Sequence, residues 1–279
     1  MIHLLLLLWL WEPGPLPTPP ALAPLQIAGQ FLAPTGWPAM RSYLCCEAAG
    51  QAKRQTLGQQ IPPRVQRTCQ LVAQDSAAAV VAVELRDSTS RRDFYLHFSK
   101  STGTWKLRAV RGLAMTHLSR PMVSILTAMP PAEVAQYDLK HPDAHHAFTV
   151  GNLRLWTSAD ADIAAHFQRN RADFEAVLRL VQTGRYFEPP ASEAAPNSGE
   201  QAANADPAVH ALLRKLYLSH VTRRETGCGS CLEFVIGGKV NSTVGLLYQP
   251  QPTQLPRMHP DRLIVLKPLG AGWYLYKTA

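Results

Sequence analysis

The sequence predicts an α+β protein, and three observations support that fold class. Between Ala77 and Met115, three runs rich in β-branched and aromatic residues are separated by the turn-forming segments DSTS and KSTG, which is typical of an antiparallel meander. Amphipathic helical patterns lie on both sides of the meander. Beyond residue 207, a helical pattern is followed by four more strand-like runs. We therefore expect a helix packed on a curved antiparallel sheet, and a smaller C-terminal unit of helix and antiparallel sheet.

The chain opens with an apolar segment. Residues 2–11 read IHLLLLLWLW, which is too short to span a bilayer as a helix and is followed at once by a Pro-rich stretch. We interpret residues 1–24 as a signal peptide, with an uncleaved anchor or a different start codon as the alternatives. The segment has no Lys or Arg before the apolar run, and Pro24 follows the candidate cleavage site Ala-Leu-Ala at 21–23. The prediction is an exported protein, in the periplasm, in the cell envelope or secreted.

Four segments make up the expected domain organisation. After the leader, residues 36–187 form an N-terminal α+β domain, residues 188–206 a flexible linker and residues 207–279 a C-terminal α+β unit. The linker prediction rests on a stretch of Ala, Pro, Ser, Asn and Glu without a single large apolar residue. A chain of 279 residues is long enough for about two domains of ordinary size.

The elements of the N-terminal domain follow from residue spacing and from breakers. Alternation in the third meander strand predicts that Trp105, Leu107 and Ala109 share the core face. Expected in order are a helix within 36–56, a strand over 65–73, the meander, a helix broken at Pro130–Pro131, a His-rich loop over 138–148, a strand over 149–156 and one helix over 157–184.

The second meander strand carries the candidate catalytic residues Asp93, Tyr95 and His97 on one face, because they alternate with apolar residues. If that face lines a pocket, a carboxylate, a phenol and an imidazole would provide general acid/base groups of the kind used beside a carbonyl. If the face meets solvent, it is an ordinary polar face, which is what alternation alone predicts.

The densest group of potential metal ligands is His141, His145 and His146, together with Asp143. Pro142 and the polar neighbours favour a loop, and a transition-metal site needs a further ligand held by a second set of contacts. We therefore predict no dedicated metal site, and no cofactor.

One Cys-x-x-Cys motif runs from Cys228 to Cys231. A redox-active motif of this type needs its first thiolate at a helix N-terminus, whereas this one runs directly into the strand predicted over 232–236. A zinc site would need two more ligands, and no second Cys-x-x-Cys or His-x-x-x-His is nearby. We expect either a structural disulfide or two unpaired thiols in a tight Gly turn.

A helix followed by a meander whose last strands read DFYLHF and TWKLRAV resembles the cystatin-like cone fold of nuclear transport factor 2 domains. The resemblance covers about residues 36–116. It implies a curved sheet whose open end forms a pocket, and activities that range from isomerases and dehydratases to catalytically silent binding modules. No family motif is matched onto which a catalytic residue could be carried. The run from Val244 to Thr278 is similar to the tails of small exported proteins of Bacteroidetes type. This similarity implies a cellular location more than an activity.

The function expected is that of a non-enzymatic ligand-binding or structural module of the cell envelope, whose partner is a small molecule or an envelope protein. The alternative is a pocket enzyme that uses the acid/base residues of the strand 93–97. A third class, an anionic polymer on a basic surface, would require Lys106, Arg108, Arg111 and Arg91 to cluster. The 28 Lys and Arg, against 20 Asp and Glu, are scattered as singles and pairs, so nucleic acid is not an expected partner.

Overall fold

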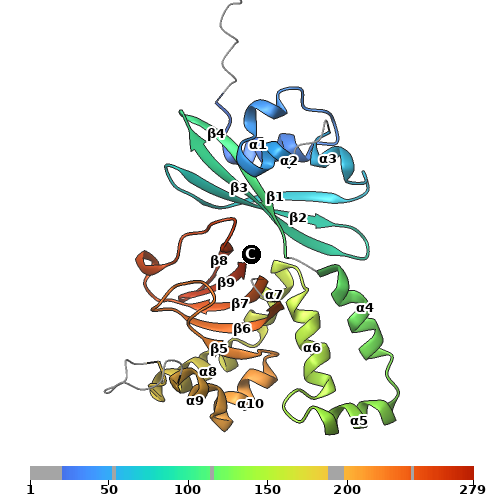
Figure 1. Cartoon of the computed structure of the whole chain (residues 1–279), viewed down its shortest axis with the longest axis vertical. Coiled ribbons are helices and arrows are strands. Elements are labelled where there is room, and N and C mark those ends of the chain that lie inside the picture. The colour runs from blue at the N-terminus through green and yellow to red at the C-terminus, as the bar shows by residue number, and fades with distance from the viewer. Residues whose placement is uncertain (1–20, 52–54, 114–115, 188–197, 240–241) are drawn as a thin grey trace, which may run out of the picture.

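The computed structural model describes residues 21–51, 55–113, 116–187, 198–239 and 242–279 of the chain (Figure 1). The predicted α+β class is confirmed, because a four-stranded and a five-stranded antiparallel sheet are combined with helices. Most of the segment interpreted as a signal peptide lies outside the described residues, as do residues 188–197 of the predicted linker. Within the ranges described, no helix is long and apolar enough to cross a membrane.

The predicted meander forms the first sheet, together with the strand expected over 65–73. Its strands follow one another in the order β1-β2-β3-β4, each antiparallel to the next. Their bounds are Gln66–Gln74 for β1, Ala78–Arg86 for β2, Arg91–Ser101 for β3 and Thr104–Arg111 for β4.

Short helices cover one face of this sheet, where Leu96 and Phe98 are buried (Figure 1). They are α1 (Pro24–Leu32), η1 (Met40–Tyr43), α2 (Cys46–Gln51) and α3 (Leu57–Gln60). The single helix predicted within 36–56 is therefore wrong. Leu44 forms a bridge with Leu107 of β4, and the backbone of Cys46 has a φ of 53°, so η1 and α2 cannot join into one helix.

A β-bulge changes the face of one predicted core residue. The register between β3 and β4 shifts between His97, which is opposite Ala109, and Phe98, which is opposite Leu107. Leu107 therefore lies on the helix-covered face, whereas Ala109 lies on the face of His97. The prediction that Trp105, Leu107 and Ala109 share one face holds for the first two residues alone.

Three helices follow the first sheet: α4 (Thr116–Thr127), α5 (Pro131–Lys140) and α6 (His146–Trp156). The break predicted at Pro130–Pro131 is confirmed. The strand predicted over 149–156 is wrong, because this segment belongs to α6. Its buried residues Leu155 and Trp156 belong to the core cluster of the second sheet, a placement that a short apolar run does not reveal.

The long helix predicted over 157–184 is divided into α7 (Asp160–Arg169) and α8 (Arg171–Thr183). The chain bends at Asn170, whose φ of −110° and ψ of 18° are not helical. Ala159 is the N-cap of α7, and Gly184 is the C-cap of α8.

The second sheet has the strand order β5-β6-β7-β9-β8. Before it come α9 (Ser198–Ala205) and α10 (Pro207–Lys215), so the part of the predicted linker from 198 to 205 is helical, with Ala203 fully buried. The strands are β5 (His220–Thr222), β6 (Leu232–Lys239), β7 (Ser242–Tyr248), β8 (Leu263–Gly270) and β9 (Trp273–Thr278), and the short helix η2 (Pro252–Gln254) lies between β7 and β8.

The main hydrophobic core does not follow the predicted domain boundary. Phe167 of α7 and Phe174 of α8 pack on Trp273 of β9, with ring centroids 5.4 and 5.8 Å apart. Helices α6 to α8, which we assigned to the N-terminal domain, thus share one core with the second sheet. The reason is that their apolar stripes need a sheet face, and the helix-covered face of the first sheet is already occupied.

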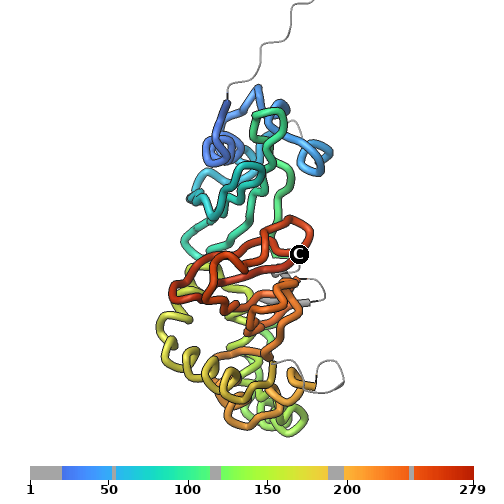
Figure 2. Tube along the Cα trace, turned by 90° about the vertical axis from the view of Figure 1, so that its left-hand side faces the viewer, coloured from blue at the N-terminus to red at the C-terminus, as the bar shows by residue number. Residues whose placement is uncertain are grey.

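The second face of the first sheet meets the second sheet, and Figure 2 shows from the side how the two sheets and the lower helices follow one another along the long axis. A small apolar cluster joins Val80, Ala82 and Tyr95 to Ile264 and Val265 of the edge strand β8. We call this contact region the joint. It places the predicted polar face of β3 in the interior of the molecule.

Candidate functional site

The candidate site lies in the joint, on the first-sheet face that meets the second sheet. The register pairs Glu84 with Asp93 and Ala82 with Tyr95, so these side chains share that face. Strand β1 adds Gln70, which is opposite Ala82. Alternation along three neighbouring strands thus gathers polar groups at one place on the sheet.

Helix α7 brings Asp160 into this polar group. Asp160 is the first residue of the helix and is only 4% exposed. The N-cap Ala159 has no side chain that could accept a hydrogen bond, and the Asp160 N–H instead donates to Oδ2 of Asp93 over 2.7 Å. A carboxylate at this position satisfies a free N–H group and is favoured by the helix dipole. Asp93 therefore caps α7 from the first sheet.

Two lysines of the second sheet complete the arrangement. Lys267 of β8 places Nζ 2.6 Å from Oδ2 of Asp160, and Lys277 of β9 places Nζ 2.6 Å from Oδ1. The hydroxyl of Tyr95 donates to the same Oδ1 over 2.7 Å. Asp93, Tyr95, Asp160, Lys267 and Lys277 are called the Asp160 cluster below. Lys277 is 3% exposed, so this is a buried ionic network.

Burial and charge push the pKa values of the two carboxyl groups in opposite directions. Burial opposes the ionisation of Asp160, but the ammonium groups of Lys277 and Lys267 outweigh it and hold the pKa of Asp160 below its usual range. Burial, followed by the negative charge of Asp160, raises the pKa of Asp93. Burial and both carboxylates raise the pKa of Tyr95 well above its usual value, so Tyr95 remains a hydrogen-bond donor.

Two cavities flank the Asp160 cluster. The larger has a volume of about 420 Å³ and is called the cleft below. The charged residues that line it, which we call its polar end, are Glu84, Asp93, Asp160 and Lys267. Thr68 and Gln70 also line it, and its apolar lining includes Leu71, Val72, Ala161, Ala164, Leu269 and Leu275. The smaller cavity, of about 260 Å³, is lined by Asp93, Lys277, Arg91 and Arg92 among others. Asp93 faces both. A volume of about 300–1,000 Å³ is usual for small-molecule sites.

The structure separates the three candidate catalytic residues. Of Asp93, Tyr95 and His97, only Asp93 lines either cavity. Tyr95 is fully buried against Asp160, and His97 is 3% exposed. Burial, followed by the charge of Arg111, lowers the pKa of His97 to about 4, so this imidazole is neutral at neutral pH. The solvent-exposed polar face that alternation predicts is therefore wrong, because a second sheet covers it.

The candidate metal ligands lie around Tyr137 and Asp138. Nδ1 of His145 lies 3.7 Å from a carboxylate oxygen of Asp138, while Nε2 of His146 lies 2.8 Å from the carbonyl oxygen of Leu126. The ring of His141 packs on Tyr137. In the part of the chain that the structure describes, no group of three or more His, Cys, Asp or Glu side chains is placed to hold a metal ion.

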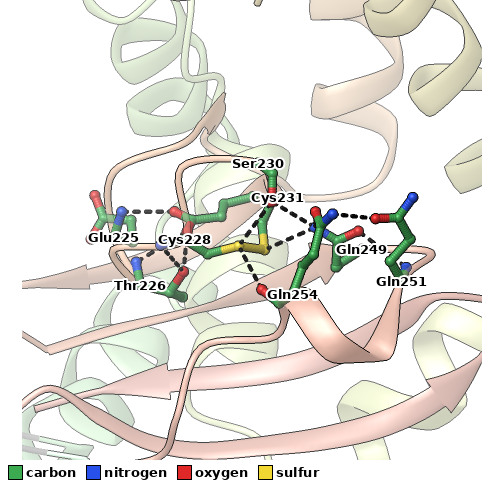
Figure 3. The surroundings of a disulfide bond; sticks show 9 residues. Glu225, Thr226, Cys228, Ser230, Cys231, Gln249, Gln251 and Gln254 are labelled. Carbon is green, nitrogen blue, oxygen red and sulfur yellow. Dashed lines mark hydrogen bonds between the residues drawn. A yellow bond between two sulfur atoms is a disulfide. The ribbon is translucent and has the colours of Figure 1, made fainter.

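The Cys-x-x-Cys motif is a disulfide between Cys228 and Cys231 (Figure 3). Both sulfur atoms are enclosed: Cys231 is fully buried, and the side-chain amide of Gln249 points at its sulfur from 3.9 Å. Cys228 lies against the carbonyl oxygen of Gln254. The bond closes the tight turn that precedes β6, and its sulfur atoms contact Gln249 and Gln254 of the segment after β7, which is a structural role.

Two of the four basic residues considered for an anionic polymer, Arg111 and Arg91, lie against carboxylates. Arg111 of β4 binds Glu47 of α2 and, at 2.8 Å, Asp261 of the second sheet's loop. Arg91 lies 3.3 Å from Glu84. Two of the four residues of that group are therefore neutralised by carboxylates, and Arg111 belongs to the joint.

Sequence reasoning missed Asp160, Lys267 and Lys277 as parts of one site. Asp160 lies near the start of a predicted helix and the lysines lie in predicted C-terminal strands, and local spacing gives none of them a role in a site. A signal was present nonetheless. Lys267 and Lys277 interrupt the apolar runs RLIVLKPL and GWYLYKT, and a charge inside such a strand requires a buried partner.

Comparison of the chain with protein-family models, with curated proteins and with solved structures gives no match.

Proposed function

We propose that this protein is a binding protein that takes a small molecule with an apolar body and a polar head group into the cleft. The observation that carries the proposal is the Asp160 cluster, which fixes charged groups in the lining of a cavity that is otherwise largely apolar. Small-molecule sites combine mostly apolar walls with a few well-placed polar groups. Because both sheets and α7 hold the cluster, the cleft is formed before any ligand arrives.

The charges at the polar end favour a cationic head group. Three carboxylates, Glu84, Asp93 and Asp160, line the cleft against the single ammonium group of Lys267. Both oxygens of Asp160 are already engaged by Lys267 and Lys277. Glu84 is paired with Arg91, so Asp93 is the carboxylate that would attract an incoming amine and repel an incoming carboxylate.

We also propose that the protein acts outside the cytoplasm, as a module of the cell envelope. The apolar segment 2–11 and the disulfide between Cys228 and Cys231 support this location, because disulfides persist in oxidising compartments. Intact mass spectrometry of the fractionated native host tests it. A full-length chain in the cytosol with five free thiols would contradict it.

The binding proposal is tested by calorimetry with two probes that differ in head group alone, hexylamine and hexanoate. Ala161→Trp places an indole in the cleft from the exposed second residue of α7. Its matched control is Ala172→Trp, at the exposed second residue of α8, outside the residues that line the cleft.

We expect hexylamine to bind the wild-type chain at least about tenfold more tightly than hexanoate, which corresponds to about 1.4 kcal/mol. Ala161→Trp should abolish this binding and Ala172→Trp should leave it unchanged. Equal affinity in both tryptophan variants would show that the amine binds elsewhere. Preference for hexanoate would overturn the proposed head group.

A second candidate function is acid/base catalysis by Asp93. It is favoured because neighbouring carboxyl groups whose pKa values are pushed apart are typical of catalytic pairs, and because Asp93 faces both cavities. NMR of an amine ligand incubated with wild type and with Asp93→Asn separates the two functions. Chemical change of the ligand that Asp93→Asn abolishes indicates an enzyme, and an unchanged ligand indicates a binding protein.

A further inference from the structure

Two adjacent cysteines at the junction of η1 and α2, Cys45 and Cys46, have their thiols in contact. Sγ of Cys46 lies 3.0 Å from Sγ of Cys45, and neither belongs to the disulfide of the second sheet. Adjacent residues of a regular strand point to opposite faces, so this contact requires a turn in the backbone. Cys46 has a φ of 53°, an uncommon conformation for a residue other than glycine, which provides the turn.

The backbone on both sides of the pair is held in place. The N–H of Cys45 donates to the carbonyl oxygen of Leu107 over 2.9 Å, and Cys46 is the first residue of α2. The thiol of Cys46 is exposed, whereas Cys45 is half-buried with its sulfur 3.6 Å from the hydroxyl of Ser99. A small reagent therefore reaches Cys46 first and finds Cys45 directly behind it.

We propose that Cys45 and Cys46 form a redox modification site, which low-molecular-weight disulfides convert into a disulfide between adjacent residues and low-molecular-weight thiols restore. In the first step the Cys46 thiolate attacks the small disulfide, forms a mixed disulfide and releases one small thiolate. In the second step the Cys45 thiolate attacks Sγ of Cys46 and releases the other small thiolate. The protein loses two protons and two electrons, and the small disulfide gains the two electrons.

This adjacent disulfide is expected to be reduced more easily than the one in the second sheet. Consecutive Cα atoms are about 3.8 Å apart, below the range of about 4.4–6.8 Å in ordinary disulfides, so the ring is strained. Strained and exposed disulfides are the labile ones. In contrast, the Cα atoms of Cys228 and Cys231 are 5.4 Å apart and both residues are buried.

The site is tested on the full chain equilibrated with mixtures of reduced and oxidised glutathione, quenched with an alkylating reagent and digested with trypsin. Both thiols fall in the peptide 42–53. Under oxidising mixtures we expect this peptide to lack both alkyl groups and to be lighter by two hydrogen atoms than the reduced peptide. As the mixture becomes more reducing, it should regain both thiols before Cys228 and Cys231 do.

Single serine variants keep the test decisive. Cys45→Ser should retain glutathione on Cys46, because the resolving thiol is gone, and Cys69→Ser should behave as the wild type. Glutathione that persists on Cys46 of the wild-type chain would overturn the proposal. A disulfide from Cys69 to either residue, or two free thiols under all mixtures, would also overturn it.

Discussion

Strand β3 is buried on both faces, but by different chemistry on each. Under α1, η1 and α2, Leu96 and Phe98 belong to a cluster of apolar side chains. On the other face Asp93 and Tyr95 meet Asp160 and two lysines across the joint. Alternation of polarity along a strand therefore indicates which partner each face accepts, and does not indicate which face is exposed.

The two faces also differ in what they contribute to the free energy of unfolding. Burial of apolar side chains stabilises the fold through an effect that has no preferred direction. A buried ionic network stabilises it only when every charge has its partner. Removing one member of the apolar face leaves a cavity. Removing one member of the Asp160 cluster leaves charges without partners in a region closed to water.

The largest loss in the free energy of unfolding is expected for Asp160→Ala. It leaves Lys267 and Lys277 without their carboxylate, and removal of one partner from a buried pair costs about 3–5 kcal/mol. Urea denaturation measures this loss. The control is Asp162→Ala on the same helix, whose more exposed carboxylate lies 3.5 Å from Arg91 and whose loss should change stability by less than about 1 kcal/mol.

The same pair of proteins gives a pH prediction. Because the folded pKa of Asp160 lies below the unfolded value of about 3.9, this group stabilises the fold above that pH and the contribution is lost as the pH falls. The stability advantage of wild type over Asp160→Ala should therefore shrink below about pH 4. An advantage that is constant between neutral and acidic pH would contradict the ionic role.

On the apolar face, Leu96→Ala is expected to cost about 3 kcal/mol, since the side chain is fully buried and leaves a cavity. The control Leu139→Ala, at a residue 84% exposed, should leave stability unchanged. The loss in Leu96→Ala should not depend on pH, in contrast to that of Asp160→Ala. Equal stability of the two leucine variants would show that this face is not the tightly packed one.

A smaller loss is expected for Tyr95→Phe, which keeps the ring and removes the hydroxyl that donates to Asp160. Hydrogen bonds to charged groups contribute about 1.5–3 kcal/mol. In a double-mutant cycle with Asp160→Ala, the two losses should not add, because the hydroxyl acts through that carboxylate. Full additivity, measured by urea denaturation, would separate Tyr95 from the cluster.

The smallest change in the free energy of unfolding, a slight increase or none, is expected for Asp93→Asn. The folded pKa of Asp93 is raised, so its contribution to stability is greatest at low pH and is lost as the pH rises through the folded pKa. An amide oxygen can still accept the Asp160 N–H. Stability at neutral pH should therefore stay equal or rise slightly, and a loss as large as that of Tyr95→Phe would contradict this account.

Local patterns predicted the elements whose partners are close in sequence. The meander was predictable because turn residues and alternation specify hairpins locally. The bulge that moves Ala109 was not, since no local residue marks it. In the segment 149–156, Leu155 and Trp156 pack as helix residues on the second sheet, and a short apolar run does not distinguish a strand from a buried helix.

The candidate site could be predicted only in part, because its members come from distant segments. Asp93 and Tyr95 were recognised from one strand. Asp160 lies 67 residues from Asp93 along the chain, and Lys277 lies further still. Their meeting depends on how the two sheets dock, which no periodicity encodes. The sequence shows a polar face on one strand and two lysines inside apolar strands. It does not show that these groups are partners of one another.

The strand order of the second sheet has a consequence for the order in which the protein folds when its chain emerges N-terminus first. Strand β9 lies between β7 and β8, yet it is synthesised after all the other strands described (Figure 1). The first sheet consists of local hairpins and can form as soon as residue 111 has emerged, because local pairings form fastest. Asp93 and Tyr95 of this sheet are then exposed to water until Lys277 has emerged. An apolar face would promote aggregation of the partly folded chain during that interval. The polar groups on this face reduce that risk.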